Sequence, residues 1–109
     1  MTHPPKIDPR LIKVAQMVKD QNMAALAKIT TRQREIKSAI ANLDSARDRL
    51  DQSTDNFAQI SAHHQWLNQK RRALSIEAAQ LAAQSQTAKA TAARAVGRLD
   101  VLEKVLGKS

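Results

Sequence analysis

Cysteine is absent from this 109-residue chain, which excludes disulfide bridges, thiolate zinc sites and cysteine nucleophiles. Glycine and proline are nearly absent as well. The only glycines are Gly97 and Gly107, and the three prolines all lie within the first nine residues. Because neither residue type interrupts the chain from residue 10 to residue 96, a β-rich fold with its many turns is not expected.

Aromatic residues are also scarce, since Phe57 and Trp66 are the only two. A compact core usually draws on large aromatic side chains, so their scarcity favours an elongated helical pair within a single domain. No stretch approaches the roughly 20 apolar residues that span a bilayer. The first residues also lack the apolar region of a signal peptide. We therefore expect a cytoplasmic protein.

What the chain does contain is an apolar repeat of seven residues. Two interleaved series of positions begin at Leu11 and Ala15 and run to Leu102 and Leu106. Of their 28 positions 22 are apolar, 12 in the first series and 10 in the second. Alternating spacings of three and four residues, kept over many heptads, are typical of a coiled coil.

The local signals predict two helices after a disordered leader at residues 1–8. Asp8 can cap free amide groups and Pro9 suits a first helical position, so the first helix is expected over about 9–50. The turn is expected at about 51–56, in a cluster of Asp, Ser, Thr and Asn, with residues 61–64 as a second candidate. The second helix is expected over about 57–106, with Gly107 in the left-handed conformation beyond its end.

Two topologies fit this pattern, and the sequence favours an all-α, antiparallel two-helix coiled-coil hairpin. The alternative is a single long helix that dimerises as a coiled coil. The turn cluster and the many alanines of the repeat favour the hairpin. So do extra apolar residues at the two ends of the repeat, which would cover each other in a hairpin: Ile12, Val14 and Met17 at one end, and Val96, Val101 and Val105 at the other.

No motif of catalysis, phosphate binding or metal binding is present, so we predict no enzyme activity, no cofactor and no metal. The pair His63-His64 lacks a third ligand one helical turn away, and His64 is expected in the seam near the turn while His63 faces water. Asp44, Asp48 and Asp51 share one helix face. They are interpreted as a solvated charge network with the neighbouring Arg47 and Arg49.

The net charge of +8 permits an acidic protein, a nucleic acid or an anionic lipid surface as partner. Polar residues occupy several seam positions, where their usual role is to set the register of the helices. These residues are Asn22, Arg32, His64 and Arg71. For Trp66 two roles remain open, since it either covers the hairpin end or is an exposed anchor for a partner.

Three stretches resemble the FliJ-type stalk proteins of flagellar and type III secretion export ATPases. These are the opening helix at 11–29, the Gln/Arg-rich return at 66–74 and the closing segment at 94–105. The resemblance implies a coiled-coil stalk or adaptor whose paired ends enter a hexameric export ATPase. Other parts of the rod would contact the export gate or substrate chaperones.

The resemblance also suggests partner-binding residues. Leu99, Asp100, Glu103 and Lys104 match the closing motif and would face the ATPase. Trp66, Gln69 and Arg72 would serve the outer contacts. Two other functions remain as alternatives, a homo-oligomeric coiled-coil scaffold and a basic rod that binds nucleic acid, and the chain is expected as a monomer or a homodimer.

Overall fold

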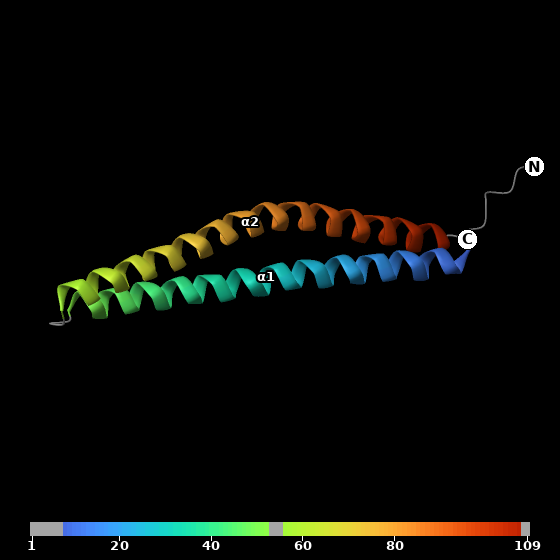
Figure 1. Cartoon of the computed structure of the whole chain (residues 1–109). Coiled ribbons are helices and arrows are strands. Elements are labelled where there is room, and N and C mark those ends of the chain that lie inside the picture. Colours follow the sequence, from blue (N-terminus) through green and yellow to red (C-terminus); the bar gives the residue numbers. More distant parts are fainter. Residues whose placement is uncertain (1–7, 53–55, 108–109) are drawn as a thin grey trace, which may run out of the picture. The chain divides into compact units, whose positions relative to one another are not determined.

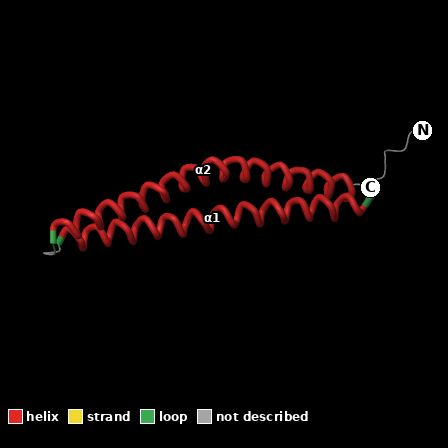
Figure 2. The backbone as a smooth tube through the Cα atoms, viewed as in Figure 1, coloured by secondary structure: helices red, strands yellow, loops and turns green. Residues whose placement is uncertain are grey.

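The computed structural model describes residues 8–52 and 56–107, and these residues form two antiparallel helices. Helix α1 comprises Pro9–Asp51 and helix α2 comprises Phe57–Gly107 (Figures 1 and 2). The all-α hairpin expected from the repeat is therefore confirmed. Most of the expected leader (residues 1–7) and the centre of the expected turn (residues 53–55) lie outside the described residues.

Both helices begin at a capping side chain. The carboxylate of Asp8 accepts a hydrogen bond from the amide of Arg10 at 3.0 Å and pairs with the Arg10 guanidinium at 2.9 Å. These contacts lower the pKa of Asp8 below its ordinary value. At α2 the side-chain oxygen of Asn56 accepts the amide of Ala58 at 2.9 Å. Asn56, expected as the last turn residue, is thus the N-cap of the second helix.

Gly107 differs from the expectation. Helix α2 runs through Gly107, and no described glycine has a positive φ. The predicted left-handed cap at this residue is therefore wrong, because the helical conformation continues to Gly107 itself. Gly97 is likewise an ordinary helical residue inside α2, with open space where a side chain would begin.

The hairpin divides into two compact units. The turn unit consists of residues 29–84 and contains the end of α1 and the start of α2. The end unit consists of residues 1–28 and 85–109 and contains the start of α1 and the end of α2. In Figure 1 the end unit is the place where the blue and red segments run side by side.

In the turn unit the buried positions follow the seven-residue repeat. Ile36 of α1 and Leu67 of α2 are its most buried side chains, at 1% and 3% exposure. Half-buried residues continue the same spacing on both helices: Ile29, Arg32, Ala39, Leu43, Ala46 and Leu50 on α1, and Ile60, His64, Leu74, Ala78 and Leu81 on α2. The predicted seam is confirmed here, with Arg71 as an exposed member.

In the end unit the repeat holds for α2 but shifts on α1. Ser85, Ala92, Ala95 and Leu99 are buried as the repeat predicts. On α1 the half-buried residues are Ile12, Ala15, Lys19, Asn22 and Leu26, so one of the two series lies one residue later than predicted. The shift exchanges the small Ala25 for Leu26 in the seam, which buries more apolar area. Lys19 can lie there because its aliphatic stem packs while its amine reaches water.

The extra apolar residues at the two chain ends do not cover each other. Ile12 is half-buried, but Val14, Met17, Val96, Val101 and Val105 are all exposed. The prediction was wrong because each helix contacts the other helix through one narrow stripe of side chains. The exposed side chains lie beside or behind that stripe, so they do not cover one another across the two helices.

Candidate functional site

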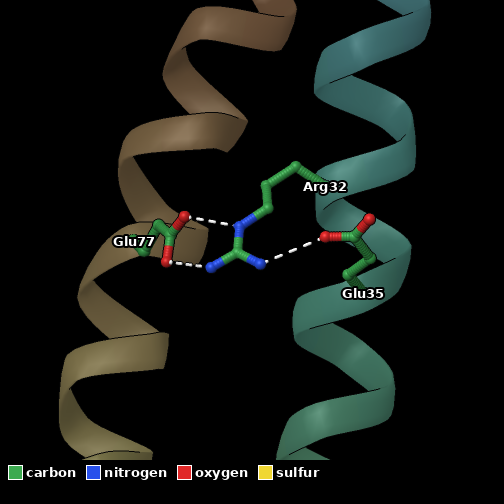
Figure 3. A network of polar contacts seen from close by, with 3 residues as sticks. All are labelled: Arg32, Glu35 and Glu77. Atoms are coloured by element: carbon green, nitrogen blue, oxygen red, sulfur yellow. Dashed lines mark hydrogen bonds and ion pairs between the residues drawn. The ribbon is translucent and has the colours of Figure 1, made fainter.

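A two-pronged polar contact in the turn unit joins Arg32 of α1 to Glu77 of α2. The Arg32 Nε donates to Glu77 Oε1 at 2.7 Å, and a second guanidinium nitrogen donates to Oε2 at 2.9 Å. A third donates to Glu35, one turn along α1, at 3.1 Å. Figure 3 shows the guanidinium held between the two carboxylates. Such a two-pronged pair is sensitive to geometry, so it discriminates between helix alignments.

The pKa values of the pair change in the directions that this contact requires. The hydrogen bonds from Arg32 hold the pKa of Glu77 below its ordinary value of about 4.5, against the opposing effect of partial burial. The bonds to Glu77 and Glu35 raise the pKa of Arg32 further above its ordinary value. Both groups therefore remain charged throughout the physiological pH range.

Two further contacts join the helices in the turn unit. Arg71 Nε donates to Asp44 Oδ1 at 2.9 Å, which raises the pKa of Arg71, and His64 Nε2 lies 2.9 Å from Asp51 Oδ1. From the first pair to the second, α1 advances seven residues while α2 goes back seven. The two pairs thus belong to one antiparallel alignment, as the register role of polar seam residues predicts.

These contacts correct one expectation and confirm another. Asp44 and Asp51 bind residues of α2, so their assignment to a network with Arg47 and Arg49 was wrong. The physical reason is that both carboxylates lie at the edge of the seam, within hydrogen-bond distance of Arg71 and His64 of the second helix. The other expectation is confirmed, since His64 is half-buried at the seam and His63 is exposed.

In the end unit a shallow groove of about 320 Å³ runs along one side of the helix pair. Its lining includes three residues assigned to partner binding, Leu99, Asp100 and Glu103. Leu99 is buried in the seam and forms the floor, whereas Asp100 and Glu103 are exposed. Lys104 is exposed too and bonds Asp100 at 3.0 Å. The other lining residues are Gln16, Lys19, Met23 and Val96.

The remaining predicted contact residues, Trp66, Gln69 and Arg72, are exposed residues of the turn unit. Trp66 is 49% exposed, with the His63 ring edge-on at 6.0 Å between centroids and the Lys70 amine 5.8 Å from its ring. It belongs to the outer surface, which fits the anchor role better than the covering role. Its role in binding remains a prediction.

Neither described helix combines the length and apolar content that a bilayer crossing requires. Across residues 8–52 and 56–107, no three His, Cys, Asp or Glu side chains gather as a metal site would need.

Comparison with family models, with curated proteins and with solved structures finds no match to this chain.

The exposure of one part of α1 was not predicted. The repeat placed Leu11 and Val18 in the seam, but both are exposed in the end unit. The available signal was another set of positions at the same seven-residue spacing, Ile12, Lys19 and Leu26, of which two are apolar. Choosing between the two series requires the packing of α2, because both are spaced like a coiled-coil stripe.

Proposed function

We propose that this chain is a non-enzymatic coiled-coil adaptor that binds a protein partner through its end unit. The observation that carries the proposal is the distribution of exposed large apolar residues. Eight of the eleven such residues among those described lie in the end unit: Leu11, Val14, Met17, Val18, Met23, Val96, Val101 and Val105. The end unit thus exposes more large apolar side chains than the turn unit, and exposed apolar surface is typical of a protein-binding region.

More specifically, we propose that the chain is a stalk or adaptor of a flagellar or type III protein-export ATPase complex. The support is the FliJ-type resemblance of the closing segment together with the exposure of Asp100, Glu103 and Lys104. These charged residues stand beside apolar ones on the paired chain ends. That combination suits insertion into a protein ring, where the apolar groups supply affinity and the charges orientation.

The test is binding to the purified export ATPase from the same genome. The chain is expected to co-elute with the ATPase. Glu103→Arg should weaken this binding. Asp48→Arg is the matched control, since it reverses an exposed acidic residue of the turn unit. Equal effects of the two variants, or no complex with the wild-type chain, would overturn the stalk proposal. A homodimer without ATPase binding would instead support a coiled-coil scaffold.

A further inference from the structure

The two sides of the helix pair in the end unit differ in charge. The side with the groove is defined by residues such as Gln16 and Met23 of α1 and Val96 and Glu103 of α2. At 100° per residue, Leu11, Val14 and Val18 lie beyond the other edge of the α1 seam. By the same geometry, Arg98 and Val105 lie beyond the other edge of the α2 seam. These five residues, together with Arg94, are called the basic face.

The basic face is apolar and cationic without acidic residues. The described acidic residues of the end unit are Asp8, Asp20, Asp100 and Glu103. Asp100 and Glu103 line the groove, and Asp20 lies on the groove side of α1, one turn from Gln16 and Met23. Asp8 is bound to Arg10 at the start of the helix. The cations on the basic face therefore have none of the unit's described acidic side chains beside them.

Arg94 and Arg98 supply the positive charge of the basic face. They stand four residues apart on α2, so their like charges are neighbours on the helix surface. Both are exposed. Such a spacing is unfavourable in the isolated chain and becomes favourable when a carboxylate approaches both residues. The same helix carries Val101 and Val105 one and two turns further on.

From these observations we infer that the basic face binds an acidic amphipathic helix of a partner protein. The inference rests on the proposed adaptor function and names the chemistry of its partner. A third helix could lie along the two-helix face with its apolar stripe on Leu11, Val14, Val18 and Val105. Acidic residues along its edge would meet Arg94 and Arg98. This is recognition of an amphipathic helix by an exposed apolar face of a helix pair, with charge selecting the partner.

Two other occupants fit the face less well. A second copy of the chain would place two basic faces against each other, so like charges would oppose the contact. A helix that binds an anionic membrane surface is rich in Lys and Arg on its polar face and carries Trp, Phe or Leu on the other, whereas the basic face has two arginines and one Leu. Both aromatic residues of this chain, Phe57 and Trp66, belong to the turn unit.

The test uses the full chain and two designed, fluorescently labelled peptides of about 22 residues, which would span about 33 Å as helices. One carries Leu at three- and four-residue spacings with Glu on the flanks. The other has Lys in place of each Glu. Fluorescence anisotropy should show binding of the acidic peptide alone, and added salt should weaken that binding.

Matched variants distinguish the contribution of the basic face to peptide binding from that of the groove side. Val18→Glu should weaken binding of the acidic peptide at least about ten-fold, which is about 1.4 kcal/mol. Val96→Glu is the control, since Val96 lies on the groove side at 45% exposure against 41% for Val18. Arg98→Glu and Lys89→Glu form a second pair of exposed cations, the latter on the groove side. Circular dichroism of each variant checks that the helices are retained.

Several outcomes would overturn the inference. One is equal binding of the two peptides, and another is equal loss in Val18→Glu and Val96→Glu. Binding of phosphatidylserine vesicles that Val18→Glu abolishes, without peptide binding, would assign the face to a membrane. A dimer that Val18→Glu dissociates would assign it to a second copy. Peptide binding without ATPase binding would keep the inference and reject the stalk proposal. ATPase binding without peptide binding would keep the stalk proposal and reject the inference.

Discussion

Arg32 of α1 donates two hydrogen bonds to the carboxylate of Glu77 on α2, at 2.7 and 2.9 Å, while it also holds Glu35 on its own helix. The contact joins residues 45 positions apart in the chain. Since the seam is built mostly from small and aliphatic side chains, which pack acceptably in more than one alignment, such directional contacts specify the pairing of the two helices in the turn unit.

The coupling between these two residues can be measured with a double-mutant cycle. Arg32→Gln and Glu77→Gln should each lower the melting temperature. The double variant should lose less than the sum of the two, because each single variant already removes the shared contact. Arg34→Gln is the control, since it removes an exposed Arg two positions away. Thermal unfolding followed by circular dichroism gives the values, and additive effects would show that the pair is not coupled.

Acid should weaken the turn unit through Glu77. The pKa of Glu77 is lower in the folded chain than its ordinary value of about 4.5, so the charged form is favoured by folding. Its stabilising contribution is therefore complete above pH 4.5 and is lost as the pH falls through the folded-state pKa. Melting temperatures between neutral and strongly acidic pH should fall less steeply for Glu77→Gln than for the wild type. Parallel curves would contradict this assignment.

The core of the turn unit depends on few side chains, and Ile36 is the most buried of them. Ile36→Ala should cost about 2–5 kcal/mol of unfolding free energy, because it removes buried methylene groups and leaves a cavity. Ile76→Ala makes the same chemical change at a residue of the same unit that is 53% exposed. It should remain within about 0.5 kcal/mol of the wild type. Urea unfolding measures both, and similar losses would contradict the described burial.

Gly97 offers a stabilising substitution. It lies inside α2 without a positive φ, and an added Cβ would meet nothing within 4 Å. Gly97→Ala should therefore raise the unfolding free energy by about 0.5–1 kcal/mol, because alanine loses less backbone entropy in a helix. Ala93→Gly, one turn earlier at an exposed position, should lower it by a similar amount. A destabilised Gly97→Ala variant would show that a contact requires the glycine.

The amino-acid sequence by itself determined the fold class and the approximate extent of the helices. A seven-residue apolar repeat without glycine or proline from residue 10 to residue 96 predicts long paired helices. Asp8-Pro9 and the polar cluster around Asn56 mark the helix starts because capping is a local interaction between neighbours in the chain. The seam of the turn unit could be predicted for the same reason, since it follows from spacing alone.

Contacts between distant residues were decided only by the tertiary structure. The repeat predicted Leu11 and Ala25 as seam residues, but packing against α2 placed their neighbours Ile12 and Leu26 there instead. The carboxylates of Asp44 and Asp51 had cationic neighbours on their own helix. Their actual partners, Arg71 and His64, come from the other helix. The basic face was also decided only by the tertiary structure. It combines one edge of each helix, and the packing of the α1 and α2 seam residues determines which edges lie on the same side.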